Sequence, residues 1–292
     1  MLDFRVETFL CVCRHMNFTR AAEELHITQP AVSQHIRALE TQYHARFFSY
    51  EGKKLSLTPA GGLFLRTATT MRHDVRHLKE ELAGLQKHRQ NIIFGATLTI
   101  SEYIMPSPLA RLLRENPETA VRMLTANTAE LLRALDEGEI DFAIIEGFFE
   151  KGEYDSLPYL TERYIAVCSP DYRFEKPPAA LEDLLCERLL TREPGSGTRE
   201  ILERYLEERN LTIRDFRSVA ELGNLNAIKA LAEAGQGVAF LYEPTVRREL
   251  HEGALREIPL PGCRMSHDFT FLWRKNSVFA EEYRALFELL RQ

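Results

Sequence analysis

Apolar residues recur with helical spacing near the start of the chain. Between residues 18 and 43, two short amphipathic helices are predicted to meet at a polar corner. Thr28 is a suitable N-cap for the second helix, and Pro30 falls in its first turn, where the missing N–H costs nothing. The apolar positions of this helix are spaced i, i+4, i+7 and i+11: Val32, Ile36, Leu39 and Tyr43. The pattern predicts a helix-turn-helix.

The opposite face of this second helix is polar. Glutamine can read adenine and arginine can read guanine in the DNA major groove. Periodicity alone also fits a helical hairpin that only builds core, so the flanking segments decide between the two interpretations. As a recognition helix, it would contact DNA through Thr28, Gln29, Pro30, Ser33, Gln34 and Arg37.

The segment after the hairpin predicts a β-wing. Residues 47–50 and 55–57 are short and extended, and they flank the sequence Glu51-Gly52-Lys53-Lys54. Two lysines at such a tip can meet phosphates without reading base sequence. Lys53 and Lys54 are therefore candidate DNA contacts.

A long helix is predicted next, with Thr58 as N-cap and Pro59 at its first position. Its apolar residues follow a heptad spacing, which favours a partner helix, and a second copy of this helix is the expected partner. A dimer would place two recognition helices on one duplex. Packing of this helix on its own chain's larger domain is the alternative. The seam consists of Phe64, Ala68, Met71, Val75, Leu78, Leu82 and Leu85.

From residue 91 onward, short apolar strands alternate with helices. This alternation predicts α/β layers with mostly parallel sheets. Helices are expected at 199–208, 225–233 and 280–290, and Asn127 opens another with a capping-box pattern. The expected strands are 92–97, 120–125, 140–145, 163–168, 219–222, 238–241 and 269–273, with a further segment at 189–190.

Ligands in such sheets bind at the carboxyl ends of the strands. This rule selects several polar residues as a candidate effector site, although Thr99, Ser101 and Thr128 could each be mere N-caps. Glu146 would pair with a ligand amine, or with Arg192 or Arg199 in an empty cleft. The candidates are Thr97, Thr99, Ser101, Thr128, Glu146, Gly195, Ser196, Thr198 and Arg199.

The loop Gly195-Ser196-Gly197-Thr198 is the sharpest of these signals. Two glycines let the backbone approach a ligand closely, and the helix that follows offers free N–H groups suited to an anion. A plain capped loop is the alternative. The loop matches neither GxxxxGK[ST] nor GxGxxG after a strand, so nucleotide binding is not predicted.

Charge divides the chain. Residues 1–89 carry 13 basic and 9 acidic residues, a net charge of +4, whereas the whole chain carries −6. The chain has no run of about 18 apolar residues and no signal-peptide pattern at its start, so a cytoplasmic protein without membrane spans is expected. Its 5 cysteines are scattered, which favours reduced thiols and neither a metal site nor a redox switch.

An enzyme is not expected. GxSxG and HExxH are absent, and His251 and His267 are the only histidines beyond residue 89. Ser196 could imitate a nucleophile, but no neighbouring histidine supports it. A DNA-binding protein that senses no ligand remains an alternative.

Together these motifs resemble the LysR-type transcriptional regulators over the whole chain. The resemblance rests on AAxxL at 21–25, TQPAVSQHIRALE at 28–40, the wing, LTPAG at 57–61, the long helix and the α/β half. Two positions depart from the family pattern. His44 stands where the family usually has Gly after the recognition helix, and Tyr50 stands where it usually has Arg.

The resemblance implies a mixed fold. A winged helix-turn-helix would span 1–58 and a linker helix with a hinge 59–90. A sensor of two Rossmann-like subdomains, similar to periplasmic binding proteins, would span 91–292, with subdomain I at about 91–163 and 268–292 and subdomain II at about 164–267. It also implies operator DNA and RNA polymerase as partners, a dimer of dimers, and a small, anionic effector in place of a cofactor.

Overall fold

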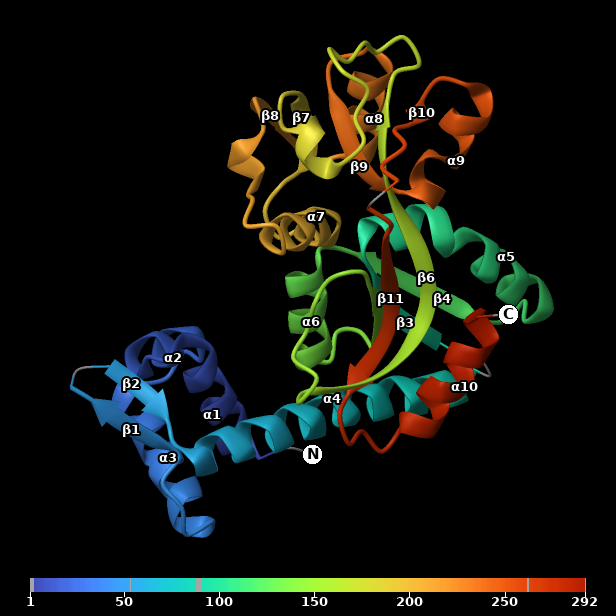
Figure 1. The fold of residues 1–292 in the computed structure, drawn as a ribbon. Helices are drawn as coiled ribbons and strands as arrows, with labels where there is room; N and C mark the ends of the chain where they lie inside the picture. The colour runs from blue at the N-terminus through green and yellow to red at the C-terminus, as the bar shows by residue number, and fades with distance from the viewer. Residues whose placement is uncertain (1–2, 53, 88–90, 262, 292) are drawn as a thin grey trace.

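The computed structural model describes residues 3–52, 54–87, 91–261 and 263–291. Figure 1 shows three parts in chain order: a small head, a long helix and a two-lobed domain. The helices of the head are α1 (Phe4–His15), α2 (Phe18–Glu24) and α3 (Gln29–Gln42), and its strands are β1 (Phe48–Glu51) and β2 (Lys54–Leu57). The long helix is α4 (Pro59–Lys87). The mixed fold class predicted from the sequence is confirmed.

Aromatic rings hold the head to the start of α4. Phe47 stacks on Phe64 with ring centroids 4.4 Å apart, and Phe9 meets Phe64 edge-on at 4.9 Å. Gly61 is required here because a Cβ at this position would lie 2.0 Å from the carbonyl oxygen of Phe47. The Thr58 hydroxyl caps α4 by accepting from the Gly61 N–H at 3.0 Å, as its sequence predicts.

The heptad seam of α4 is divided between two environments. Phe64 and Ala68 pack into the head, whereas Met71, Leu78 and Leu82 are 54%, 46% and 53% exposed. Val75 is half-buried, and the side chain of Leu85 lies outside the described residues. A different face of α4, with buried Thr69, His73 and His77, packs on the two-lobed domain of its own chain. Packing on the own chain's larger domain is therefore seen for one face, whereas pairing of the exposed seam with a second copy stays a prediction.

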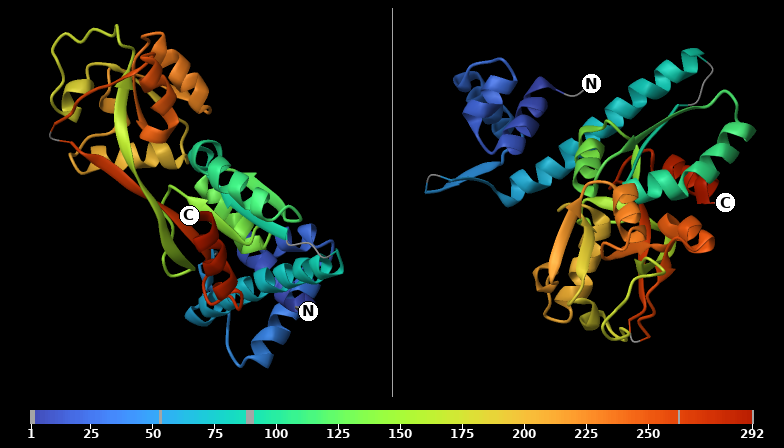
Figure 2. Two further views of the ribbon diagram at one scale, coloured as in Figure 1. Left: turned by 90° about the vertical axis from the view of Figure 1, so that its right-hand side faces the viewer. Right: turned by 90° about the horizontal axis from the view of Figure 1, so that it is seen from above.

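Two long antiparallel strands join the lobes. They are β6 (Tyr154–Cys168) and β11 (Met265–Arg274), and they run side by side through the waist of the domain in Figures 1 and 2. The expected subdomain boundaries, at about 163/164 and 267/268, fall within these two strands. In the described part of the chain, they belong to a sheet of 9 strands, and β10 (Arg256–Glu257) pairs with β6. The order of the other strands is β4 (Ala120–Thr125), β3 (Asn91–Ala96), β5 (Phe142–Ile145), β11, β6, β9 (Val238–Tyr242), β7 (Arg188–Arg192) and β8 (Ser218–Leu222).

Each lobe carries parallel strands. The first lobe holds β3 (Asn91–Ala96), β4 (Ala120–Thr125) and β5 (Phe142–Ile145), covered by η1 (Ile100–Ile104), α5 (Pro106–Glu115), α6 (Thr128–Glu137) and α10 (Ala280–Arg291). The second holds β7 (Arg188–Arg192), β8 (Ser218–Leu222) and β9 (Val238–Tyr242) with the short β10 (Arg256–Glu257). Its helices are α7 (Gly197–Glu207), α8 (Leu225–Glu233) and α9 (Glu243–Glu252), with short turns η2 (Leu181–Leu184) and η3 (Ile213–Asp215).

Several expected boundaries are wrong. The strand expected from residue 163 begins at Tyr154, because its first half has exposed polar residues that hide the apolar run. The strand expected at 140–145 begins at Phe142. Tyr43, expected in the core stripe of α3, is 50% exposed and stands at the C-cap, with its ring 5.0 Å from that of Phe64.

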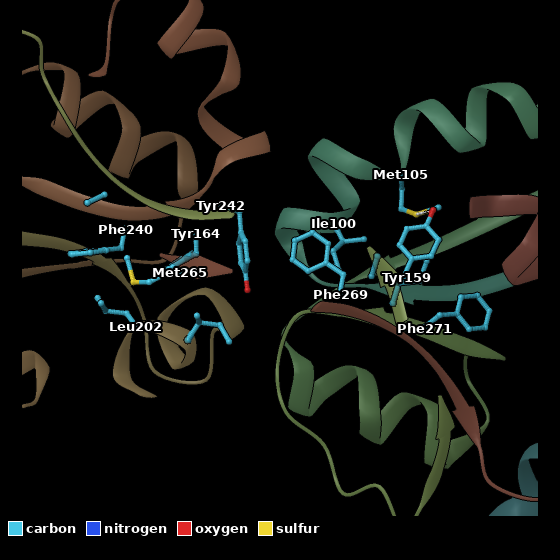
Figure 3. Packing of buried hydrophobic residues seen from close by; sticks show 14 of the residues in the cluster. Ile100, Met105, Tyr159, Tyr164, Leu202, Phe240, Tyr242, Met265, Phe269 and Phe271 are labelled. Carbon is cyan, nitrogen blue, oxygen red and sulfur yellow. Dashed lines mark hydrogen bonds between the residues drawn. The ribbon is translucent and has the colours of Figure 1, made fainter. Parts of the chain in front are cut away.

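Buried aromatic residues fill both lobes and meet at the waist. In Figure 3, Tyr164, Phe240 and Tyr242 lie on one side and Ile100, Tyr159 and Phe271 on the other. Tyr242 meets Phe269 across the gap, edge to face at 4.8 Å. Among the helices of the described residues, none is both long and apolar enough to cross a membrane.

Candidate DNA-binding surface and effector cleft

Helix α3 presents its predicted polar face to solvent. Gln29, Gln34 and Arg37 are exposed and Ser33 is partly so, while Val32, Ile36 and Leu39 are buried beneath. The Thr28 hydroxyl caps the helix by accepting from the Ala31 N–H at 3.3 Å. Gln29 donates from Nε2 to the Ser33 hydroxyl at 3.0 Å, which holds the two side chains together at the exposed start of the helix. This face is free to enter a major groove.

The wing forms as predicted from β1 and β2. Lys54 is exposed at its tip, opposite Glu51 in the hairpin register, whereas Lys53 lies outside the described residues. Tyr50, the residue that departs from the family pattern, is 67% exposed on β1. The other departure, His44, has a backbone φ of +51°, so a non-glycine residue holds the left-handed conformation after α3.

Three of the nine predicted effector residues, Thr97, Glu146 and Ser196, line a cavity of about 180 Å³ at the boundary between the lobes. Glu130, Arg192 and Glu193 also line it. This volume is below the roughly 300–1,000 Å³ of ordinary ligand pockets, so the cleft suits a small molecule. Thr97, Thr99, Thr128, Glu146, Ser196 and Thr198 are all buried.

Glu146 is the central group of the cleft. It follows β5 in the first lobe and is 1% exposed, and its Oε1 accepts from the Thr198 hydroxyl of the second lobe at 3.1 Å. Burial raises the pKa of Glu146 to about 7, against hydrogen bonds from Thr99 and Thr198 and the positive charge of Arg192. Its Oε2 has no hydrogen-bond partner among the described residues. Its direct partner is therefore a threonine. Of the two pairings expected from the sequence, the one with Arg192 or Arg199 is not formed among the described residues, and the one with a ligand amine stays a prediction.

The glycine-rich loop brings α7 against this carboxylate. A Cβ on Gly197 would lie 2.5 Å from Cγ of Glu146, so only glycine allows the approach. Gly195 has a φ of +87°, which turns the loop into the helix. The carbonyl of Thr198 accepts from the Tyr164 hydroxyl at 2.8 Å. The first turn of α7, predicted to face an anionic ligand, thus faces the carboxylate of Glu146.

Three predicted residues have other surroundings. Arg199 points to Glu203 and Glu221, with N–O distances of 2.8 and 2.6 Å, and does not line the cleft. The Ser101 hydroxyl donates to the carbonyl of Leu98 at 3.0 Å. Gly195 shapes the turn without lining the cavity. For Thr99 and Thr128 the capping alternative fails, because Asn127 is the N-cap of α6 and Thr99 makes no side-chain cap.

Arg192 is one of the polar cleft residues that the site prediction omitted, with Asn127, Glu130 and Glu193. It is 6% exposed and pairs with Glu193 through two hydrogen bonds of 2.8 and 2.7 Å, while its Nη1 has no hydrogen-bond partner in the described part of the chain. Thr97 and Thr128 also have hydroxyls without such partners. Arg192 follows the strand segment at 189–190. The rule that ligands bind at the carboxyl ends of strands, which selected Thr97, therefore also points to Arg192.

A helix-turn-helix head on a two-lobed, cleft-bearing domain defines a DNA-binding regulator with a ligand-sensing domain. Residues 5–62 match the family model for the bacterial regulatory helix-turn-helix protein of the lysR family, and residues 86–292 match that for the LysR substrate binding domain. The chain belongs to the LysR family of transcriptional regulators. It is a regulator and not an enzyme.

Relatives and solved structures agree with this assignment. The HTH-type transcriptional regulator CfxR of Cupriavidus necator is 31% identical over 88% of this chain and 81% of its own. CysL of Bacillus subtilis is 29% identical over 84% of this chain and 82% of its own. The crystal structure of ArgP from Mycobacterium tuberculosis has a TM-score of 0.65 at 20% identity, covering 100% of this chain and 98% of that one. LysG from Corynebacterium glutamicum, solved with bound effector Arg, has a TM-score of 0.63 at 16% identity, covering 99% and 98%.

Proposed function

We propose that this regulator responds to a small metabolite that combines an anionic group with at least one hydrogen-bond donor. Two buried groups in the cleft support this chemistry. Arg192 Nη1 offers a charged donor for the anion, and Glu146 Oε2 offers an acceptor; neither has a hydrogen-bond partner among the described residues. Buried polar groups are normally paired, so a ligand that pairs both is favoured.

The charge of the cleft refines the anionic effector expected from the sequence. Glu130, Glu146 and Glu193 line the cavity with a single arginine, Arg192. A dianion would meet three carboxylates there, whereas a zwitterion or a hydroxy acid offers a donor to Glu146. Amino acids and hydroxy acids are therefore the proposed effector class. No cofactor is proposed for this cleft.

The effector acts, in this proposal, through the angle between the lobes. A ligand changes an equilibrium only by binding one arrangement more tightly than another. The Glu146–Thr198 hydrogen bond joins the two lobes at the cleft, so a ligand that bonds to Glu146 competes with it or reinforces it. Either outcome changes the angle between the lobes, and hence the spacing of the DNA-binding heads in the oligomer.

Oligomerisation belongs to the same proposal. The exposed apolar residues Met71, Leu78 and Leu82 of α4 favour pairing with a second chain. Such a pair would set two α3 helices on one operator, and a dimer of dimers would bend the DNA between them. RNA polymerase is the proposed downstream partner, and the cytoplasm the proposed location.

A thermal-shift screen tests the effector class. Amino acids, hydroxy acids, dicarboxylates and simple amines are compared on the full-length protein, because a bound ligand raises the melting temperature by mass action. Stabilisation by the first two classes only, lost in Arg192→Gln, supports the proposal. Arg188→Gln is the control, since Arg188 lies on the same strand but is exposed and bonds to Ser218 instead. Stabilisation by dicarboxylates or amines alone contradicts the class, and no stabilisation favours a regulator without a ligand response.

A further inference from the structure

The linker helix α4 lies on the effector-binding domain of its own chain through two buried histidines. His73 is 0% exposed, and its Nε2 lies 3.2 Å from the carbonyl oxygens of both Ile140 and Asp141. His77, one turn later, is 4% exposed. His73 is therefore satisfied by backbone groups, and His77 is the group whose role is open.

The ring of His77 is held in a defined orientation. Its Nδ1 lies 2.7 Å from Oδ1 of Asp141, and Phe279 and Tyr283 of the α10 region pack on it with centroid distances of 4.3 and 5.6 Å. A carboxylate bonded to Nδ1 leaves Nε2 as the lone-pair nitrogen of a neutral imidazole. This Nε2 has no hydrogen-bond partner among the described residues.

Two carboxylates lie where that nitrogen points. Glu81 follows His77 by one helical turn on α4, and Glu282 comes from α10, with its Oε2 3.5 Å from His77 Nε2. One ligand atom of each of the three side chains lies within 4.8 Å of the other two. A cation held among these side chains would offset the repulsion between the two carboxylates.

We propose that His77, Glu81 and Glu282 bind one divalent transition-metal ion, with Zn²⁺ and Mn²⁺ as the fitting examples. Imidazole nitrogen and carboxylate oxygen are ligands that such ions accept. Asp141 would hold the ring from behind, as carboxylates commonly do at metal-bound histidines. Three protein ligands leave a position for water in a tetrahedral site.

The geometry needs only small movements. Ligand bonds of about 2.1 Å separate the ligand atoms of a tetrahedral ion by about 3.4 Å. Glu81 and Glu282 are partly exposed, so their side chains can rotate inwards, whereas His77 is already fixed. The ion would tie α4 to α10. Because α4 also carries Phe64 of the head's core, such a tie would fix the direction of the head relative to the effector-binding domain.

A proton is the competing occupant. Burial lowers the pKa of His77, but the hydrogen bond with Asp141 and the negative charge of Glu282, whose Oε2 lies 3.5 Å from Nε2, outweigh it and raise the pKa to about 10. An imidazolium held between carboxylates would fill the same place without metal.

Metal content of the full-length protein decides between them. Metal-stripped protein is titrated with ZnCl₂ and with MnCl₂ by calorimetry, and bound metal is counted by mass spectrometry after dialysis. We expect the Glu81→Gln and Glu282→Gln variants each to bind one ion per chain fewer than the wild type. Glu80→Gln and Glu281→Gln are the controls, because these exposed neighbours should keep the ion. Asp141→Asn should weaken the affinity about 10- to 100-fold without abolishing binding.

A second cluster needs to be distinguished, because Cys11, His15 and Glu24 of the head also lie within ligand distance of one another. Cobalt(II) separates the two sites, since a cysteine ligand adds a thiolate-to-cobalt charge-transfer band that an N/O site lacks. A cobalt spectrum without that band, lost in Glu282→Gln, supports the proposal. A wild type that binds no ion, or an ion retained in Glu81→Gln and lost in Cys11→Ser, overturns it.

Discussion

Thr198 donates a 3.1 Å hydrogen bond to Glu146 across the boundary between the two lobes. The donor sits in the first turn of α7 in the second lobe and the acceptor follows β5 in the first, so the bond joins elements of the two lobes. Gly197 allows this approach, because any larger residue would collide with Glu146.

Replacement of Thr198 by Val removes the donor while keeping the shape of the side chain. Loss of a buried hydrogen bond to a charged or partly charged group should lower the free energy of unfolding by about 2 kcal/mol. The effector-induced thermal shift should vanish, while DNA binding without effector stays intact. Thr198→Ser, which keeps the hydroxyl, is the control for both measurements. If Thr198→Val also loses DNA binding, the residue has a folding role instead.

Glu146 should make stability depend on pH. Its pKa rises from 4.5 to about 7 on folding, so the folded state retains a proton that the unfolded state has already lost between these values. Stability therefore falls as pH rises from about 4.5 to about 7, by about 3 kcal/mol in total at roughly 1.4 kcal/mol per pKa unit. Glu146→Gln should remove this fall. Urea unfolding of both proteins at pH 5 and pH 8 measures it, and an equal fall in both proteins would contradict the assignment.

The parts of the fold that depend on local pattern were predictable from the sequence. The apolar face of α3, its Thr28 cap, the wing and the capping box at Asn127 each need only neighbouring residues, and the structure has all of them. The start of β6 was not predictable, because exposed polar residues conceal that strand.

Distant partners explain the misses in the site. Arg199 was predicted in the cleft from its position in the loop, but Glu221 on β8 draws its guanidinium away. The His77 cluster was also hidden, because Glu282 lies some two hundred residues beyond its partners on α4. Side chains that meet only through tertiary packing leave no spacing signal along the chain.

His44→Gly should stabilise the protein. His44 holds a φ of +51°, a conformation that costs a residue with a side chain roughly 1 kcal/mol relative to glycine. Its side chain is exposed, so little packing is lost. The free energy of unfolding of the head should rise by about 0.5–1 kcal/mol, measured by denaturant unfolding. His44→Ala should give no such gain, and equal gains in both variants would mean that backbone strain is not the cause.

Charge on the exposed seam of α4 should prevent pairing of chains. Leu78 and Leu82 are 46% and 53% exposed in the single chain, so Leu78→Glu with Leu82→Glu leaves the monomer's core untouched. If α4 pairs with its copy, two buried carboxylates per chain should shift the protein to smaller assemblies. Sedimentation velocity at several concentrations measures this shift. Lys79→Glu, exposed on the same helix but outside the seam, is the control; an unchanged assembly in the seam variant would place the interface elsewhere.

Arg37 and Lys54 should affect DNA binding in different ways. Arg37 is exposed on the polar face of α3, where a guanidinium can reach a base edge, whereas Lys54 at the wing tip can reach only phosphates. Arg37→Ala should therefore weaken binding to an operator selected from random duplexes by about 1–3 kcal/mol and relax the preference at one position. Lys54→Ala should weaken binding to all duplexes alike, and it should reduce the slope of log affinity against log salt concentration by about one. Fluorescence anisotropy on specific and scrambled duplexes over a salt series separates the two effects. Equal losses on both duplexes for Arg37→Ala would make Arg37 a phosphate contact, because a residue that reads a base must discriminate between sequences.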